Sequence, residues 1–304
     1  MSNFKVDVII PTYNRLELLE KELESLSAIP IPSELQHIHI IENGGVFGAK
    51  EIVDRFTKIL PVNYHYLDKG NLSLARNEGM RISSADFLIF YDDDMTFINT
   101  SISAYVEAFK QNGRDCFYGG SLTPNYEDEP EQWLIEFLPE SAKGFSLGSK
   151  GRFLTGSPFL GGNHAVPREA LEAIGGYDLR SAVGDNTGAV GEEKRMQAKL
   201  TAQGYKAVYV PDALVLHFVP KNNCDKKWLK KRAYRHGFTE GCNDAEKKNV
   251  RLFMGFPLFC ARALFTLWLA KCFYFVTFRK KLRFKNTLKI QKTLGYISAF
   301  FEDS

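Results

Sequence analysis

Short apolar runs and helical periodicities alternate along the first ninety residues of the chain. The apolar runs predict buried strands at residues 6–10, 37–41, 62–67 and 86–91. The segments between them carry apolar residues three or four positions apart, as in Leu16, Leu19 and Leu23, which predicts amphipathic helices. Buried strands that alternate with helices indicate a mostly parallel sheet flanked by helices, an α/β fold of the Rossmann type.

This fold class predicts where a ligand binds. In open α/β sheets, ligands lie beyond the carboxyl ends of the parallel strands. The loops that follow Ile10, Ile41 and Tyr91 are therefore the expected positions of a functional site.

The pattern changes in the second half of the chain. Residues 115–220 are less regular and rich in glycine, although a helix is predicted from Glu192 to Gly204, where glycine suits the helix end. Residues 221–251 are rich in Lys and Arg, and a strongly apolar stretch follows. We therefore expect a first domain at residues 1–220 and a helical, basic and apolar C-terminal region at 221–304.

The apolar stretch, residues 252–278, contains only two charged residues, Arg262 and Lys271. It exceeds the roughly 20 residues that span a bilayer. Three interpretations are open: a segment on a membrane surface, a packed helix or homodimer interface, and a true membrane span. Basic residues on both sides lack the asymmetry of a simple span and suit anionic lipid, so we expect peripheral membrane contact through 252–292.

Charge supports a division between the two parts of the chain. The net charge is +3 over 304 residues, but residues 1–220 carry 20 Lys and Arg against 30 Asp and Glu, whereas residues 221–304 carry 19 against 6. The acidic residues 1–220 could bind a metal ion, and the basic residues 221–304 could bind phosphates or a membrane surface. The tail includes aromatic residues, but nothing in the predicted fold supports base or groove recognition, so we expect no nucleic acid.

Composition is that of an ordinary globular protein, with 44% hydrophobic and 25% charged residues, which excludes disordered and collagen-like classes. The five cysteines show no zinc-ligand spacing and are interpreted as reduced thiols. The strand pattern begins near Val6 without a signal-peptide pattern. We expect a cytoplasmic protein at the inner face of the cell membrane.

The clearest chemical motif is the run of three aspartates at 92–94, directly after the strand FLIFY. Residues two apart in extended backbone point the same way, so Asp92 and Asp94 can converge. Clustered carboxylates repel each other unless a cation lies among them, and Mg²⁺ or Mn²⁺ prefers oxygen ligands. A solvated acidic turn is the alternative for such a motif in isolation, but the position after a buried strand favours a metal site.

Three further motifs follow or adjoin the predicted strands. PTYNR (11–15) ends the first strand, where Thr12 or Asn14 would alternatively serve only as a helix N-cap. IENGG (41–45) ends the second strand with a carboxylate, which can accept hydrogen bonds from a nucleobase, and with glycines that admit a ligand to the backbone. NLSLARNEG (71–79) carries Arg76, which is either a diphosphate partner or a surface charge.

Read in order, these motifs resemble the family 2 glycosyltransferases, which have a GT-A fold. The second half extends the resemblance with GGNHAVPREALEAIGGYD (161–178), GAVGEEKRMQAKLTAQG (188–204) and YVPDALVLH (209–217). The resemblance covers about residues 5–220 and implies sugar transfer from a nucleoside-diphosphate sugar. No single motif is specific for this family, but the number of motifs and their order along the chain are.

The resemblance also implies site residues. It assigns the donor nucleotide and its diphosphate to Pro11, Thr12, Tyr13, Arg15, Glu42, Arg76, Asp92 and Asp93. Glu42 stands where the family has aspartate, which leaves the preferred nucleobase open. A divalent cation, Mn²⁺ or Mg²⁺, would be held by Asp94 with Asp92 and His217. A structural histidine is the alternative for His217.

For catalysis, the resemblance assigns the general base to Glu193, with Glu192 as a rival because the family's usual Glu-Asp pair is here Glu-Glu. A carboxylate at a helix N-terminus stays ionised, which suits a base, although a helix cap is the alternative interpretation. The family further implies inversion by single displacement and a hydroxyl acceptor, either a polysaccharide or a lipid-linked intermediate. Asp185, Asn186 and Trp133 are candidate acceptor contacts, whereas Asp178 is expected to fix a turn.

Other classes of protein fit less well. A nucleotidyltransferase needs a glycine-rich phosphate loop after the first strand, and PTYNR has no glycine. A dehydrogenase needs GxGxxG after a strand, which is absent from the sequence. A non-catalytic, membrane-associated carbohydrate-binding scaffold would keep the fold and the tail, but has little use for both DDD and GEE.

Overall fold

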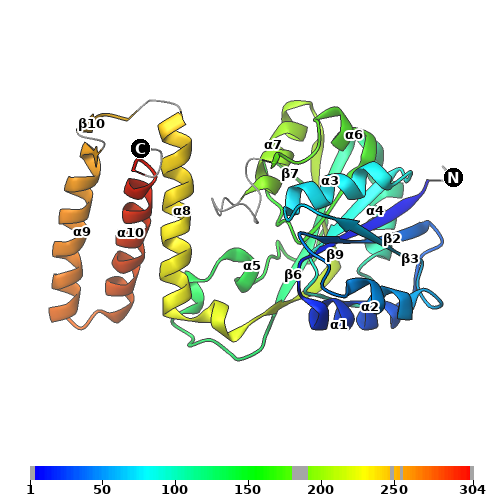
Figure 1. Ribbon diagram of the computed structural model, residues 1–304, viewed down its shortest axis with the longest axis horizontal. Coiled ribbons are helices and arrows are strands. Elements are labelled where there is room, and N and C mark those ends of the chain that lie inside the picture. The colour runs from blue at the N-terminus through cyan, green and yellow to red at the C-terminus, as the bar shows by residue number, and fades with distance from the viewer. Residues whose placement is uncertain (1–3, 180–190, 247–249, 254–255, 302–304) are drawn as a thin grey trace. The chain divides into compact units, whose positions relative to one another are not determined.

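The structure is a computed structural model that describes residues 4–179, 191–246, 250–253 and 256–301. The chain forms two compact units. The first unit comprises described residues 4–125, 140–179 and 191–218, and the second comprises 126–139 and the described residues after 218. Figure 1 labels strands and helices of both units.

A large sheet forms the first unit, with strand order β3-β2-β1-β4-β8-β6-β9-β5 and β7 paired to β9. The strands are β1 (Val6–Thr12), β2 (Leu35–Asn43), β3 (Val62–Leu67), β4 (Phe87–Tyr91), β5 (Met95–Phe97), β6 (Cys116–Tyr126), β7 (Arg152–Leu154), β8 (Asn163–Pro167) and β9 (Lys206–Val219). Strands β1 to β4 pair in parallel, as the sequence predicts, whereas the pairs β4–β8, β6–β8, β5–β9 and β7–β9 are antiparallel. The parallel part of the sheet coincides with the part whose strands alternate with helices in the sequence.

Helices flank this sheet, and successive strand residues face opposite sides of it. The helices are α1 (Leu16–Ser27), α2 (Ala49–Phe56), α3 (Leu72–Ile82), α4 (Ser103–Asn112), α5 (Glu140–Lys143), α6 (Arg168–Ala173) and α7 (Glu192–Ala202), with a short 3₁₀ turn at Gly113–Asp115. On β1, Val8 and Ile10 join a core with residues of α1, α2 and α4, while Ile9 joins a core with residues of α3, α6 and α7. The two-residue period of β1 thus supplies both layers.

The helix ends agree only partly with the sequence prediction. The N-cap of α1 is Arg15, and no side-chain hydrogen bond caps that helix, so the alternative that Thr12 or Asn14 caps it is wrong. Asn71 caps α3 by accepting a hydrogen bond from the Leu74 N–H at 2.8 Å. Gly204 has a φ of +93°, the left-handed conformation expected just after the end of α7.

The second unit contains three long helices, α8 (Lys226–Glu246), α9 (Leu258–Val276) and α10 (Lys280–Ser298). Short 3₁₀ turns lie at Ile135–Phe137 and Lys221–Cys224, and β10 (Leu252–Phe253) pairs with β11 (Phe256–Pro257). Helices α8 and α10 pack closely because glycines stand at their contact: a Cβ on Gly237 would lie 1.8 Å from the Lys292 carbonyl oxygen, and one on Gly295 would lie 1.9 Å from that of Tyr234. The packing of α8 on α10 therefore depends on the absence of side chains there.

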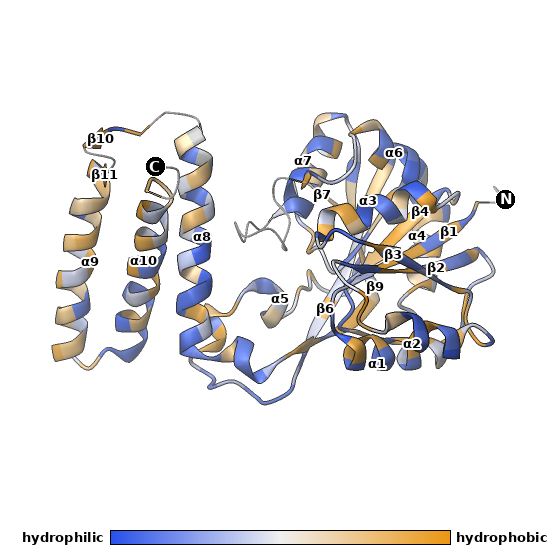
Figure 2. Ribbon diagram, viewed as in Figure 1, coloured by the Kyte–Doolittle hydropathy of each residue, from blue (hydrophilic) through white to orange (hydrophobic). Residues whose placement is uncertain are grey.

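Helix α9 is apolar and yet largely exposed. By length and composition it could cross a membrane, and 6% of its most apolar window is buried. Figure 2 shows that α9 is mostly coloured as hydrophobic, whereas α8 carries more hydrophilic colouring. Its exposed large apolar side chains are Leu258, Phe259, Phe265, Trp268, Leu269, Phe273, Phe275 and Val276.

Candidate active site

The three aspartates follow β4, at the carboxyl edge of the parallel strands. Asp93 is buried and accepts hydrogen bonds from the Thr12 hydroxyl at 2.8 Å and from Arg15 at 3.0 Å. Arg15 also donates to Asp94 at 2.9 Å. The PTYNR and DDD motifs, 81 positions apart at Thr12 and Asp93, are thereby joined at one edge of the sheet.

His217 brings an imidazole to the same carboxylates. Its Nδ1 lies 2.9 Å from the Ser141 carbonyl oxygen, which can only accept a hydrogen bond, so Nδ1 carries the hydrogen. Its Nε2 then faces Oδ1 of Asp94 at 3.5 Å, and that oxygen is buried without a hydrogen-bond partner among the described residues. A buried carboxylate oxygen that makes no hydrogen bond to a described residue and lies 3.5 Å from an imidazole nitrogen fits the donor set of a divalent cation.

The electrostatics of these groups follow from burial and from each other. Burial by itself would raise the pKa of Asp94, but His217 and Arg15 outweigh it and hold that pKa below its usual value. Burial raises the pKa of Asp93 to about 6, although Arg15 opposes the shift. For His217, burial would lower the pKa, and the Asp94 carboxylate reverses the effect and raises it.

A further carboxyl group lies buried in α1 near these aspartates. Glu22 is fully buried, and neither of its carboxyl oxygens has a hydrogen-bond partner among the described residues. Burial raises the pKa of Glu22 well above its usual value, and the charges of Asp93, Asp94 and Asp92 raise it further. Burial therefore favours the neutral form of Glu22 over its carboxylate.

Arg76 links two of the carboxylates that the sequence analysis identified. It is 1% exposed and donates to Asp92 at 2.8 Å, to Glu192 at 3.3 Å and to the Gly161 carbonyl oxygen at 3.1 Å. Its guanidinium also lies over the Tyr177 ring at 5.5 Å. The surface-charge alternative for Arg76 is therefore wrong, because this side chain ties the end of β4 to the start of α7.

The two glutamates at the start of α7 occupy different environments. Helix α7 begins after Gly191, whose φ is +103°. Glu192 is buried against Arg76, and burial raises its pKa although Arg76 opposes the shift. Glu193 is half-buried, and no hydrogen bond or ion pair to a described residue holds its carboxylate. It lies near Gly161, where a Cβ would be 3.5 Å from the Glu193 carboxyl carbon.

An aromatic ring lies exposed at the same edge of the sheet. Tyr13 is 56% exposed and meets Phe47 edge to face, with ring centroids 5.2 Å apart. Gly44, with a φ of +77°, lies against Gly70 so closely that a Cβ on it would be 2.6 Å from the Gly70 Cα and 2.9 Å from the Tyr13 ring. Gly44 and Gly70 therefore pack backbone against backbone beside the Tyr13 ring, and the exposed part of that ring can stack on a flat base.

Glu42 is completely buried, and both of its carboxylate oxygens have partners within the protein. Oε1 accepts hydrogen bonds from the backbone N–H groups of Phe47 and Ala49 at 2.9 and 3.1 Å, and Oε2 accepts one from the Tyr64 hydroxyl at 2.7 Å. In this structure Glu42 orders the loop that carries Phe47 and the start of α2. A direct contact between Glu42 and a nucleobase stays a prediction.

Sequence reasoning missed residues that position the site. Asn43 donates to the Thr12 carbonyl oxygen at 2.8 Å and accepts from the Asn71 N–H at 3.1 Å, so it joins three of the four N-terminal motifs. Gly162 packs against Asp92, where a Cβ would lie 2.8 Å from Oδ2. Asn43 and Gly162 both lie within motifs identified in the sequence. The polar side chain of Asn43 and the small size of Gly162 could have indicated their positioning roles. Nothing marked Ser141, which acts through its backbone.

The candidate acceptor residues are not brought together by the described structure. Asp185 and Asn186 lie outside the described residues. Trp133 belongs to the second unit, where it packs edge to face on Phe284 and lies 4.4 Å from the Lys280 ammonium. Asp178 lies 3.8 Å from Arg195, which leaves its expected turn-fixing role a prediction.

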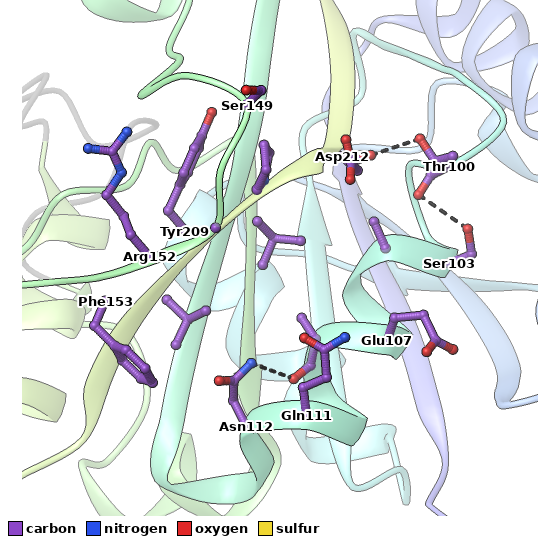
Figure 3. A pocket seen from close by; sticks show the side chains of 16 residues that line it. Thr100, Ser103, Glu107, Gln111, Asn112, Ser149, Arg152, Phe153, Tyr209 and Asp212 are labelled. Carbon is purple, nitrogen blue, oxygen red and sulfur yellow. Dashed lines mark hydrogen bonds between the residues drawn. The ribbon is translucent and has the colours of Figure 1, made fainter.

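A pocket of about 600 Å³ lies elsewhere in the first unit, beside α4 and β9 (Figure 3). Its lining includes Thr100, Glu107, Arg152 and Phe153, and none of the predicted site residues. Without carboxylates clustered at a strand end, this cavity lacks the chemistry found at the DDD motif. The size of a cavity therefore does not identify the active site here.

Comparison with known proteins identifies the class of enzyme. A sheet that resembles those of GT-A glycosyltransferases carries the carboxylates at its parallel edge. Residues 7–175 match the family described as Glycosyl transferase family 2, which is more than half of the chain. The chain belongs to this family and is a glycosyltransferase, as the sequence motifs predict.

Individual relatives agree with this assignment. The chain is 27% identical over 268 residues to the succinoglycan biosynthesis protein ExoM of Rhizobium meliloti (strain 1021), a match that covers 85% of this chain and 83% of ExoM. Its fold is similar to that of mannosyltransferase PcManGT from Pyrobaculum calidifontis, solved with GDP-Man and Mn²⁺ (TM-score 0.55, 17% identity, 99% of this chain and 74% of that one). It is also similar to GalNAc-T7, solved with UDP, GalNAc and Mn²⁺ (TM-score 0.54, 16% identity, 78% and 51%).

Proposed function

We propose that this protein transfers a sugar from a nucleoside-diphosphate sugar to a hydroxyl group of a carbohydrate or lipid-linked acceptor, with Mn²⁺ or Mg²⁺ as cofactor. One observation carries the proposal: Oδ1 of Asp94 is buried without a hydrogen bond to any described residue and faces Nε2 of His217 at the carboxyl edge of the parallel strands. Asp94 and His217 would hold the cation, with Asp92 as a further ligand. When bound, the cation would offset the negative charge that grows on the departing nucleoside diphosphate.

The remaining residues have roles that follow from their positions. Tyr13 would stack on the nucleobase beside Gly44 and Gly70. Arg15, half-exposed and already paired with Asp93 and Asp94, can turn toward the diphosphate, since its side chain is 49% exposed. Arg76 is too buried for that role and would instead hold Asp92 and Glu192 in place.

Glu193 would serve as the general base that removes the proton from the acceptor hydroxyl. It is half-buried at the N-terminus of α7, and it is free of the Arg76 ion pair that engages Glu192. A single displacement with such a base inverts the configuration at the sugar. Inversion comes from the family resemblance and is part of the proposal.

The relatives support the class of donor and acceptor. The two solved neighbours contain GDP-Man or UDP, together with Mn²⁺, and ExoM is named for the biosynthesis of a polysaccharide. The nucleotides in these two neighbours have different nucleobases, so the proposal does not specify the nucleobase of the donor. A polysaccharide intermediate assembled on the cytoplasmic side of the membrane is the acceptor class that we propose.

Thermal unfolding of the whole chain with a panel of nucleoside diphosphates and their sugars tests the proposal. We expect one nucleotide family to raise the melting temperature when Mn²⁺ is present and to lose that effect in EDTA. Incubation of the stabilising nucleotide sugar with Mn²⁺ should then release the nucleoside diphosphate. A shift without turnover would favour the scaffold alternative, and the absence of any nucleotide-dependent shift would contradict the proposal.

We further propose that α9 and the basic residues around it bind an anionic lipid surface. The side chains of Phe265, Trp268 and Phe273 on α9 are each about 60% exposed, which is costly in water. Helix α10 continues from α9 with Lys280, Lys281 and other basic residues, whose charge complements anionic headgroups. Apolar area together with positive charge is the combination that holds a peripheral protein on a membrane.

Vesicle flotation tests the lipid proposal. The double variant F265D/W268D is expected to lose binding to vesicles that contain anionic lipid, because it places two charges on the apolar surface of α9. The matched control I59D/F153D changes two apolar residues of similar exposure in the first unit and should bind as the original chain does. A wild-type chain that stays off the vesicles, or that masks α9 in a stable dimer, would overturn the proposal.

A further inference from the structure

A cluster of three histidines and one aspartate lies in the first unit, outside the candidate active site. Asp7 is the second residue of β1, whereas Thr12 at the active-site edge is the last. The two residues are five positions apart along the strand, which corresponds to about 16 Å. The cluster is therefore distinct from the DDD site, and the proposed transfer reaction does not use it.

Strand pairing brings the cluster together. Parallel β1 and β2 place Asp7 beside His37, and their register shifts between Val6 and Asp7. His37 and His39 are two apart on β2, so both side chains project on the same side of the sheet. Asp7 and His39 are buried, whereas the His37 side chain is 50% exposed, which leaves the cluster open to solvent on one side.

The donor atoms have the spacing of metal ligands. Nδ1 of His37 lies 3.5 Å from one oxygen of Asp7, and Nε2 of His39 lies 3.3 Å from the other. One donor atom from each of the three residues lies within 4.8 Å of every other. Ligands about 2.0–2.1 Å from a tetrahedral zinc ion are about 3.3 Å apart, whereas N–H···O hydrogen bonds are most often 2.9–3.0 Å long. The two histidine–carboxylate separations match this ligand spacing, although the 3.3 Å contact between His39 and Asp7 is also within hydrogen-bonding distance.

The surroundings orient these ligands. Nδ1 of His39 lies 3.0 Å from Nε2 of His65 on β3, so a hydrogen on Nδ1 can be donated to His65 while Nε2 keeps its lone pair toward Asp7. The Asp7 carboxylate accepts hydrogen bonds from the backbone N–H of His37 at 3.0 Å and from the Ser83 hydroxyl, 2.5 Å away at the end of α3. Histidine ligands of zinc typically donate their second ring hydrogen in this way.

From this geometry we propose that Asp7, His37 and His39 form a second metal site, which binds Zn²⁺ or a similar transition-metal ion. Two imidazoles and one carboxylate suit Zn²⁺, whereas the oxygen-rich DDD site suits Mn²⁺ or Mg²⁺. Three protein ligands leave a fourth position for water at the exposed side. The bound ion would tie β1 to β2, and through Ser83 and His65 to α3 and β3, which stabilises the amino-terminal side of the sheet.

Zinc titration of the whole, metal-stripped and tag-free chain tests the site. We expect Zn²⁺ to raise the melting temperature by about 5 °C at a concentration 100-fold above its dissociation constant. The variant H37A should weaken Zn²⁺ binding by at least about 100-fold, because it removes one ligand from the exposed side of the cluster without opening a core cavity. The matched control H236A changes an exposed histidine of the second unit and should bind Zn²⁺ as the original chain does.

Substitution of Co²⁺ for Zn²⁺ separates this site from the DDD site. Co²⁺ in place of Zn²⁺ should give the intense visible absorption of a four-coordinate ion, and H37A should lose it while D94N retains it. If D94N instead abolishes the absorption and the Zn²⁺ stabilisation, the ion binds at the DDD motif and the proposal is wrong. Zn²⁺ binding that is equal in H37A and the original chain would also overturn it.

Discussion

Replacement of Asp94 by asparagine is expected to reduce sugar transfer by at least about 10³-fold, and to remove the response of the remaining activity to Mn²⁺. Asparagine keeps the size of the side chain but removes the charge that faces His217 at 3.5 Å. Oδ1 of Asp94 is buried, and no described residue donates a hydrogen bond to it that could take the place of a cation. Initial rates measured over a range of Mn²⁺ concentrations give both effects.

The control for this variant is D54N, which neutralises an exposed carboxylate of α2 that is paired with Lys50. It should retain full activity. A D94N protein that is folded, as judged by its melting temperature, and that transfers sugar at a near-normal rate would contradict the metal assignment. An inactive D94N with unchanged Mn²⁺ affinity would place the cation on other ligands.

The same pair of residues sets an expected pH dependence of Mn²⁺ binding. Asp94 raises the pKa of His217, and an imidazolium cannot bind a metal ion. Mn²⁺ must therefore displace a proton from His217 at any pH below that raised pKa, so its affinity should increase with pH and level off above it. In H217Q the slope over this range should be smaller, because the competing proton is gone.

The sequence predicted the part of the fold that depends on local pattern. Strands β1 to β4 and the helices between them lie where apolar runs and helical periods alternate, because each run must be buried on both faces of the sheet. The antiparallel pairs of β6, β8 and β9 could not be predicted in the same way. Their partners are far apart in sequence, and nothing local encodes which strands will pair.

The candidate site shows a similar limit. The motifs predicted which segments meet at the site. They did not predict which side chains bond to other parts of the protein and hold those segments together. Glu42 has both carboxylate oxygens occupied by its own loop and Tyr64, and Arg76 is enclosed by Asp92, Glu192 and Gly161. Burial of a charged residue depends on partners that converge in space, and a single sequence gives only their order along the chain.

Glu193→Gln is expected to lower the turnover number by about 10²- to 10⁴-fold, the usual worth of a general base, while the donor still binds. Glutamine keeps the shape of the side chain but cannot take the proton of the acceptor hydroxyl. Turnover, together with donor affinity measured by calorimetry in the presence of Mn²⁺, separates this effect from loss of binding. A uniform loss of donor affinity would indicate a structural role instead.

Glu192→Gln is the matched control, because it makes the same glutamate-to-glutamine substitution at the adjacent residue. Its carboxylate is buried against Arg76 at 3.3 Å, so the substitution should mainly lower the melting temperature by removing one partner of that guanidinium. Arg76 keeps its contacts to Asp92 and the Gly161 carbonyl oxygen, which should preserve most of the turnover. If Glu192→Gln is the inactive variant and Glu193→Gln turns over normally, the base is Glu192, and Arg76 then holds a catalytic carboxylate rather than a structural one.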